Sequence, residues 1–375
     1  MIHLCPRTGP SAVANKSRIQ AVDQMVEFID EQGGIFGAQL DLHTSDTFGT
    51  AEGAKRAYAR MLRQVGEGPI FLLCDPISEY ALAGSLTEDE IPALGPGISS
   101  EAQDGFLVGL DAAPAQHLAF FLQDLVANWN ERRPQGAGNE IRLAVLSWPQ
   151  ELSGVILTPE LLTYAERLGI EIALQADLPA EPDANIFDFI YEARDANVNV
   201  IYTNARSYGL AALLNGLHDL GLLERFVVAA PAFVYDSQLY DYLADPVYAE
   251  GLYLSSAWAW WNEVDNPGVQ MSNEIFDRGI GSADVDWAAL QMAAAVDIAR
   301  QALEVAILQD GFAKLSPETV TDALSSLEDY PALGGLFAVD YSHGARSLLQ
   351  LRLWMVASAQ EELLPVTEYL PVPDL

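Results

Sequence analysis

Basic residues are scarce in this chain. Its 375 residues include 53 acidic but only 19 basic side chains, and the lysines are limited to Lys16, Lys55 and Lys314. The net charge of -34 would repel phosphate backbones and anionic lipid headgroups, which argues against binding to nucleic acid or to a membrane surface. The simplest interpretation is an acidic, solvated surface that keeps the protein soluble.

Long apolar runs are also missing. No window of about 18 apolar residues occurs, so the sequence predicts no membrane span. The most apolar helical segment, residues 290–308, is interrupted by Asp297 and Arg300. Met1 runs directly into the strand-like segment Ile2 to Cys5, without the pattern of a signal peptide. Such a start fits either a cytoplasmic protein or the mature part of an exported one.

The chain has only two cysteines and no motif for metal or nucleotide chemistry. Cys5 and Cys74 each end an apolar strand-like run, and both a disulfide and two buried free thiols remain open. The five histidines show no metal-ligand spacing, and G-x-S-x-G, P-loop and G-x-G-x-x-G patterns are absent. We therefore expect no metal and no cofactor, and these absences lower the odds of an enzyme.

What is present is a repeated alternation of strands and helices. The length predicts two domains, and the composition, 50% hydrophobic and 19% charged, is that of a globular protein. Helical segments separate two series of strand-like runs, at residues 2–5, 39–43, 69–73, 91–94 and 106–110, and then at 142–146, 171–174, 198–203 and 226–229. This order predicts an α/β fold of two doubly wound lobes with parallel sheets.

The stretch from Phe28 to Thr47 carries a family resemblance. It reads as a helix end, a glycine stop, a turn closed by Gly37, and a strand in which Leu40 and Leu42 alternate with polar residues. It resembles the start of the type I periplasmic binding proteins, the group that includes the leucine/isoleucine/valine-binding proteins of ABC transporters. The matching residues are Phe28, Ile29, Asp30, Gly33, Gly34, Ile35, Gly37, Asp46 and Thr47. Later segments at 200–204, 322–324 and 334–340 resemble the same family, so the likeness covers essentially the whole chain.

The resemblance implies an architecture and a function. The type I periplasmic binding protein fold has two lobes joined by a three-crossing hinge, here expected near 111–113, 254–257 and 339–344. The N-terminal lobe would comprise 1–112 plus 256–338, and the C-terminal lobe 113–255 plus 339–375. Such a protein is periplasmic or membrane-anchored outside the cell and is not an enzyme. It captures a small amino acid, amide or carboxylate in the interlobe cleft by hinge closure and presents it to the membrane subunits of an ABC permease.

The loop from Gly95 to Ser100 is the strongest candidate for ligand binding. Glycines permit close backbone approach, and N–H groups with serine hydroxyls can hold a small carboxylate. In the resembling proteins this loop binds the head of an amino acid, and Gly97 and Ser99 fall on those positions, with Ser100 beside them. Asp111 is expected either to receive a ligand ammonium or to cap a helix that begins near Ala113.

Further candidates follow other strands. They are Ser78 in the first lobe and Trp148, Asn204 and Arg206 in the second. Trp148, with Trp258, Trp260 and Trp261, forms either an aromatic wall for the ligand or packing at the hinge. The chain departs from the family at Ala230-Pro231-Ala232, where amino-acid binders often have an acidic residue. Losing that acid weakens the case for a plain amino acid ligand, because a desolvated ammonium needs a compensating charge.

Two other functions stay open at this stage. One is a cytoplasmic ligand sensor with the same fold that regulates a protein partner. The other is an α/β enzyme, for which the supporting observation would be turnover that is lost on replacing a single acid.

Overall fold

The chain divides into two compact units. The computed structural model describes residues 1–9, 12, 15–65, 70–97, 106–181, 184–236, 238–276, 287–358 and 362–375. Unit 1 comprises Met1–Asp111 and Ala259–Leu348, and unit 2 comprises Ala112–Trp258 and Leu349–Leu375. The chain passes from one unit to the other three times, and the third passage follows Leu348.

The last crossing lies later than the sequence predicted. Residues 339–348 were expected in the second lobe, but hydrogen bonds within unit 1 hold them there. The hydroxyl of Tyr341 donates to the carbonyl of Gly109 at 2.9 Å, and the N–H of Gly109 donates to the carbonyl of Arg346 at 2.7 Å. The N–H of Leu348 donates to the carbonyl of Asp111. The segment therefore adds to the edge of the first sheet.

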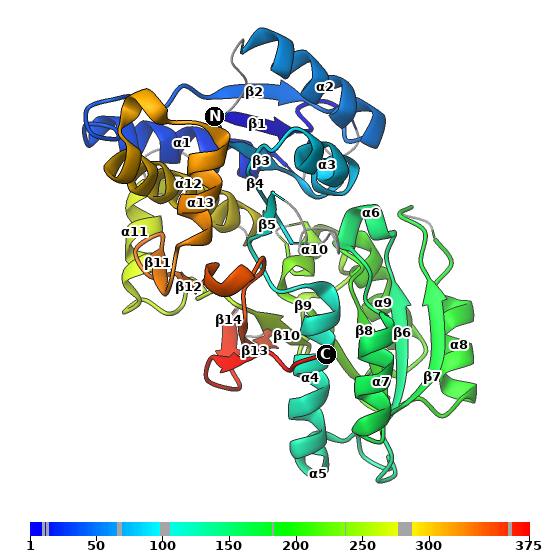
Figure 1. Ribbon diagram of the computed structural model, residues 1–375. Helices are drawn as coiled ribbons and strands as arrows, with labels where there is room; N and C mark the ends of the chain where they lie inside the picture. Colours follow the sequence, from blue (N-terminus) through cyan, green and yellow to red (C-terminus); the bar gives the residue numbers. More distant parts are fainter. Residues whose placement is uncertain are drawn as a thin grey trace. The chain divides into compact units, whose positions relative to one another are not determined.

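Unit 1 contains a five-stranded sheet in which every pairing is parallel. The strand order is β2-β1-β3-β4-β5 (Figure 1). The strands are β1 Ile2–Cys5, β2 His43–Asp46, β3 Leu72–Cys74, β4 Ala93–Gly95 and β5 Leu107–Gly109. The order changes direction between β1 and β3, and in sheets of this kind ligands bind beyond the carboxyl ends of the strands at such a point.

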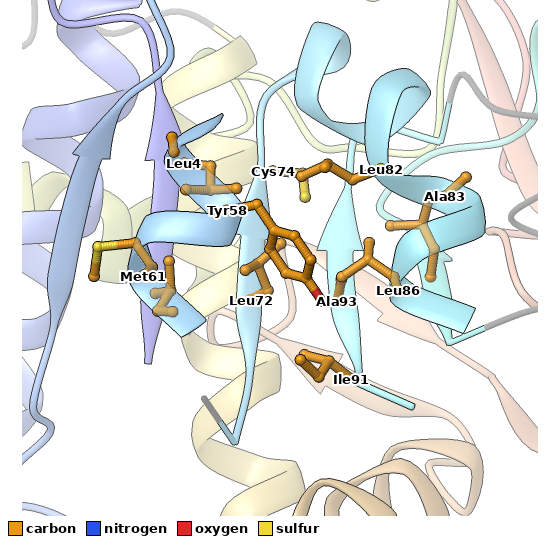
Figure 2. Packing of buried hydrophobic residues seen from close by; sticks show 13 residues of the cluster. Leu4, Tyr58, Met61, Leu72, Cys74, Leu82, Ala83, Leu86, Ile91 and Ala93 are labelled. Carbon is orange, nitrogen blue, oxygen red and sulfur yellow. The ribbon is translucent and has the colours of Figure 1, made fainter. Parts of the chain in front are cut away.

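Helices cover both faces of this sheet. α2 (Ala51–Gln64) and α3 (Pro76–Glu88) pack together on one face, and α1 (Lys16–Glu31) packs against α12 (Trp287–Asp310). Figure 2 shows Tyr58 and Met61 of α2 and Leu82 and Leu86 of α3 against the apolar strand residues, all of them almost fully buried. The remaining elements of unit 1 are α11 Pro267–Phe276, η6 Phe312–Lys314, α13 Pro317–Ser325, the hairpin β11 Tyr330–Ala332 with β12 Phe337–Val339, and η7 Ser342–Gly344.

The two cysteines are free thiols on opposite faces of the sheet. Leu4 is the register partner of Cys74, and both side chains belong to the core beneath α2 and α3. Cys5 follows Leu4 in β1, so its side chain points to the other face. Both thiols are buried and unbridged. Of the two possibilities left open by the sequence, two buried free thiols is the correct one.

The parallel part of the sheet in unit 2 repeats the strand order of unit 1. Its order is β7-β6-β8-β9-β10, followed by β13 and β14, each antiparallel to its neighbour, and β15 pairs with β13. The strands are β6 Arg142–Ser147, β7 Glu171–Asp177, β8 Val200–Thr203, β9 Val227–Pro231, β10 Tyr253–Ser256, β13 Gln350–Ala357, β14 Glu362–Pro365 and β15 Leu370–Pro371. The predicted fold of two doubly wound lobes is confirmed.

The helices of unit 2 form two pairs. α4 (Pro114–Ala127) packs with α7 (Pro159–Arg167), and α8 (Phe187–Asp195) packs with α9 (Tyr208–Asp219). Shorter elements connect the strands: α5 Trp129–Arg132, α6 Gln150–Ser153, η2 Leu223–Arg225, η3 Ala232–Val234, α10 Leu239–Tyr242 and η4 Pro246–Ala249. Among the helices of the described ranges, none combines the length and apolar character that crossing a bilayer requires.

The second strand lies further along the chain than its apolar pattern predicted. Leu40 and Leu42 were expected to alternate within a strand, but β2 begins at His43, which pairs with Ile2. Residues 39–42 span the gap from the tight Ile35–Ala38 bridge to the sheet edge, with Leu40 and Leu42 half-buried. The register with β1 therefore decides which residues of this stretch are paired.

Candidate functional site

Buried polar side chains gather at the carboxyl edge of the unit 1 sheet. Asp75 directly follows β3, and its Oδ1 accepts the N–H of Ser78 at 2.7 Å, which caps α3. Pro76 occupies the first turn, where a missing N–H costs nothing. Thr47, which follows β2, donates its hydroxyl to Asp75 Oδ2 at 3.4 Å. Ser78 is thus fully buried inside α3 and not in the loop that the sequence predicted.

The electrostatics of this edge are set by burial. Burial raises the pKa of Asp75, and the Ser78 N–H, the Arg18 guanidinium and the Ser78 hydroxyl oppose that rise. Arg18 projects from α1, is itself buried, and donates to Asn15 Oδ1 at 2.8 Å. Burial, with Asp75 as the largest charge contribution, raises the pKa of Cys5 to about 12. This thiol is therefore protonated at neutral pH and inert as a nucleophile.

The start of the predicted glycine loop is held by a buried glutamate. The N–H of Gly97 donates to Glu79 Oε2 at 2.9 Å, and Glu79 is fully buried on α3. Gly97 has a φ of +90°, and a Cβ there would lie 3.0 Å from the Asp111 carbonyl oxygen. A Cβ on Gly95 would lie 2.5 Å from Glu79 Oε2. Glycine is therefore required at both positions for steric reasons.

The hydrogen bond between Gly97 and Glu79 changes which groups of the loop can contact a ligand. Because the Gly97 N–H is already bonded to Glu79, the predicted ligand contacts fall on the residues that follow. Ser99 and Ser100 lie outside the described residues.

Asp111 does not cap α4. The helix has Ala113 at its N-cap, and the side chain of Gln116 accepts the Ala113 N–H at 2.9 Å in place of an aspartate cap. The capping interpretation of Asp111 was therefore wrong. The residue is 5% exposed at the end of β5, and its backbone carbonyl accepts the N–H of Leu348. Asp111 thus lies at the carboxyl edge of the sheet.

In unit 2, Asn204 and Trp148 tie two loops of the carboxyl edge together. Asn204 follows β8 and is fully buried; its Oδ1 accepts the N–H of Trp148 at 2.7 Å, and its Nδ2 donates to the carbonyl of Ser153 at 3.2 Å. The Trp148 ring is 5% exposed and packs on Tyr208, with ring centres 5.2 Å apart. Both side chains are committed to holding the loops after β6 and β8.

Arg206 and its neighbours present charge at the same edge. The half-buried guanidinium of Arg206 lies 4.7 Å from the ring centre of Phe233, a cation–π contact. The ring of His117 also lies edge-on to that of Phe233, with ring centres 6.4 Å apart, and His117 Nδ1 lies 2.8 Å from Ser255 Oγ. Phe233 is thereby positioned by two polar residues from separate elements, Arg206 after β8 and His117 in α4.

Ser207 and Asp236 form a polar pair that the sequence did not predict. The Ser207 hydroxyl donates to Asp236 Oδ2 at 2.5 Å. Ser207 has a φ of +43°, a left-handed conformation that is rare for a residue with a side chain and that concentrates at functional sites. Asp236 lies only a few residues beyond the Ala230-Pro231-Ala232 segment, so an acid does reach this edge. No periodic pattern marks either residue, because both lie in loops.

Sequence signals were available for other missed residues. Asp75 followed by Pro76 is the usual start of a helix, and that pattern alone indicated a capping aspartate at the strand end. Of the four tryptophans considered as an aromatic wall, Trp148 and Trp258 belong to unit 2. Trp260 stacks on Trp287 at 4.3 Å within unit 1, and Trp261 packs edge-on against Phe276.

Comparison with known families decides the identity of the fold. The model of the periplasmic binding proteins matches residues 3–351. The chain belongs to this family. Comparison with curated protein sequences finds no match.

Solved structures similar to this periplasmic binding protein come from several bacteria. One is a branched-chain amino acid ABC transporter protein from Thermus thermophilus with bound valine (TM-score 0.82, 17% identity, covering 99% of this chain and 96% of that one). Another is a fatty acid ABC transporter substrate-binding protein from Thermomonospora curvata (TM-score 0.80, 16% identity, covering 99% of this chain and 91% of that one). A third is an ABC transporter solute-binding protein from Rhodopseudomonas palustris BisB5 in complex with 3,4-dihydroxybenzoic acid (TM-score 0.76, 14% identity, covering 100% of this chain and 97% of that one).

These findings give the periplasmic binding protein a solute-binding role and imply a location outside the cytoplasm. The similar structures are substrate-binding proteins of ABC transporters, and at these identities their likeness establishes the fold. Their titles name chemically different molecules, so the fold alone does not select a ligand.

Proposed function

We propose that this periplasmic binding protein is the substrate-binding component of an ABC importer and that it captures a small amino-acid-like molecule or carboxylate. One observation carries the proposal. Each unit has the same parallel strand order, and in each the residues beyond the carboxyl ends of the strands include polar, charged or aromatic side chains. Open α/β sheets bind ligands at this edge.

Unit 1 supplies the group that binds a ligand carboxylate. In this proposal Ser99 and Ser100 donate their hydroxyls, and Gly97, which Glu79 fixes in place, sets the direction of the loop. Asp111 balances a positive group on the ligand. Ser78 acts indirectly, because its N–H donates to Asp75.

Unit 2 supplies charges of both signs beside aromatic rings. Arg206 binds an anionic group, and Asp236, oriented by the Ser207 hydroxyl, binds a cationic one. Phe233 offers an apolar surface between them, and Trp148 and Asn204 hold the loops in place. A zwitterion with an apolar side chain satisfies all three features, so Asp236 restores the case for an amino-acid-like ligand that the Ala230-Pro231-Ala232 segment had weakened.

Hinge closure is the proposed mechanism. The three chain passages between the units permit it, and a ligand that binds residues of both units favours the state in which it contacts both. The permease then recognises that state. Small-angle scattering tests this step: the radius of gyration falls on adding the ligand, and an unchanged value contradicts closure.

A thermal-unfolding screen tests the ligand class. The full chain is unfolded, stripped of bound molecules, refolded and screened against amino acids, amides, small carboxylates and aromatic acids. A ligand at about 100 times its dissociation constant adds about 2.7 kcal/mol to the free energy of unfolding. We expect the strongest shift from a zwitterion with an apolar side chain. A panel that gives no shift contradicts small-solute capture.

Variants then locate the site. Four substitutions should each raise the dissociation constant of the ligand roughly tenfold or more, the usual effect of losing a charged hydrogen bond: Ser99→Ala, Asp111→Ala, Arg206→Gln and Asp236→Asn. The matched control is Glu166→Gln, an exposed carboxylate on α7, which should leave affinity unchanged. Mass spectrometry of the released ligand distinguishes capture from turnover, because a converted product supports an enzyme.

A further inference from the structure

One helix of unit 1 holds an unusual share of the basic residues of the chain. Of the 53 acidic residues, α2 contains only Glu52. Of the 19 basic residues it contains four, which are Lys55, Arg56, Arg60 and Arg63. The rest of the chain therefore accounts for the whole net negative charge of -34, and α2 is a basic element on an acidic protein.

The basic side chains share the exposed face of α2. Its apolar residues, among them Tyr58 and Met61, are buried against the sheet and α3, whereas every charged residue of the helix is exposed. At 3.6 residues per turn, the charged positions fall within one arc of about 140°. Figure 1 shows α2 beside β2, which is the edge strand of the unit 1 sheet.

Most of these cations have no carboxylate partner. Arg60 donates to the hydroxyl of Ser45, an uncharged acceptor, at 2.5 Å. Lys55 and Arg63 take part in no hydrogen bond or ion pair with any residue in the described ranges. The exposed face of the helix therefore keeps a net positive charge that the surrounding protein does not neutralise.

The needs of the helix itself account for only part of this charge. Glu52 in the first turn and Arg63 in the last turn complement the helix dipole. Arg56 pairs with Glu52 at 3.2 Å, four residues apart, which supports the helix. Lys55 and Arg60 lie between the two ends, where neither argument applies.

The acidic surroundings of α2 decide what kind of partner fits. At about 0.15 M salt the Debye length is about 8 Å, so an anionic group close to α2 is attracted while distant carboxylates contribute little. The 14 residues of α2 span about 21 Å. An anionic membrane or a long nucleic acid extends past the helix and meets the acidic residues around it. A short acidic segment of a protein can lie on α2 alone.

We infer that the basic face of α2 is a docking surface for an acidic segment of a protein partner. Each exposed ion pair contributes little, so several together give a weak and reversible contact. The permease of the proposed function is one candidate partner, and the inference rests on the proposed function only for that candidate.

Fluorescence anisotropy of a labelled peptide of alternating glutamate and alanine, titrated with the full chain at about 0.15 M salt, tests the inference. A labelled peptide of alternating glutamine and alanine isolates the contribution of charge. We expect the acidic peptide to bind at least about tenfold more tightly than the neutral one. Equal binding of the two peptides, or no binding of the acidic one, overturns the assignment. No solute takes part, so this outcome is independent of the proposed solute site.

Two double variants with the same change in net charge locate the surface. Lys55→Gln with Arg63→Gln should weaken the acidic peptide about fivefold or more, and folding should survive because glutamine is a good helix former. The control, Arg167→Gln with Lys314→Gln, removes two exposed cations outside α2 and should leave binding nearly unchanged. Equal losses in the two variants, or undiminished binding in the α2 variant, refute the site. Phosphatidylglycerol vesicles that bind the native chain more tightly than the peptide does, and lose this binding in the α2 variant, overturn the assignment to a protein partner.

Discussion

Replacing Asp297 is the sharpest test of the unit 1 structure. Asp297 lies on α12 and is 2% exposed. Its carboxylate accepts the Tyr330 hydroxyl at 2.7 Å, the Leu333 N–H at 2.7 Å, and two nitrogens of Arg300 at 2.8 and 3.1 Å. Burial, together with the Asp297 charge, raises the pKa of Tyr330, so its hydroxyl remains a donor at neutral pH. One carboxylate thereby attaches the β11–β12 hairpin to the long helix.

The expected cost follows from what the substitution leaves behind. Asp297→Ala removes the acceptor of the half-buried Tyr330 hydroxyl and of the Leu333 N–H. Arg300 keeps its bonds to Glu304 at 2.6 Å and to the Tyr330 oxygen at 3.0 Å. Breaking a buried ion pair from one side costs about 3–5 kcal/mol. Asp297→Asn retains an acceptor and should cost about 1–3 kcal/mol. Glu304→Gln, whose carboxylate is about a quarter exposed, should cost about 0–1 kcal/mol and serves as the control.

Guanidinium unfolding measures the three free energies, and hydrogen exchange locates the effect. In Asp297→Ala, amide protection should fall in α12 and in residues 330–339 before it falls elsewhere in the described chain. If Asp297→Ala and Glu304→Gln lose the same stability, or if the hairpin amides keep their protection, the attachment argument is wrong.

Three further predictions follow from buried groups. Burial, followed by the charges of Arg18 and Arg7, lowers the pKa of His3 to about 3. Between about pH 6.5 and 3, only the unfolded chain therefore takes up this proton, so the free energy of unfolding should fall by up to about 1.4 kcal/mol per pH unit as pH falls. In His3→Gln the slope of this free energy against pH should flatten, and an unchanged slope contradicts the assignment to His3. Burial raises the thiol pKa values of Cys5 and Cys74, so a disulfide reagent at pH 8 should modify them only after unfolding, and prompt labelling of native protein is the contrary result. A Cβ at Gly209 would lie 2.4 Å from the Trp148 ring, whereas a Cβ at Gly84 would meet nothing within 4 Å. In urea unfolding, Gly209→Ala should lower the free energy of unfolding by about 1–3 kcal/mol, and Gly84→Ala should raise it by up to about 1 kcal/mol. Equal effects of the two substitutions refute the packing argument.

Much of the architecture followed from local patterns. Apolar runs of four to six residues between amphipathic helices predicted two doubly wound sheets, because only buried parallel strands need to be apolar on both faces. The glycine stop after α1 and the Asp-Pro start of α3 are also local signals. The strand expected to contain Leu40 and Leu42 was misplaced, because pairing with Ile2 fixes the start of β2 at His43. A pairing partner about forty residues away leaves no periodic pattern in the sequence.

The site divides in the same way. The sequence by itself determined that polar, glycine-bearing loops would follow the strands, since the chain must leave a buried sheet through turns that glycine and capping residues make possible. Only the tertiary structure decided which side chains meet there. Thr47 reaches Asp75, Glu79 holds Gly97, and Ser207 finds Asp236 because the strand order places their loops side by side. The same register turns Cys5 and Cys74 to opposite faces, which no count of cysteines could reveal. Contacts of this kind depend on strand neighbours rather than on sequence neighbours, and hydrophobic periodicity records only the latter.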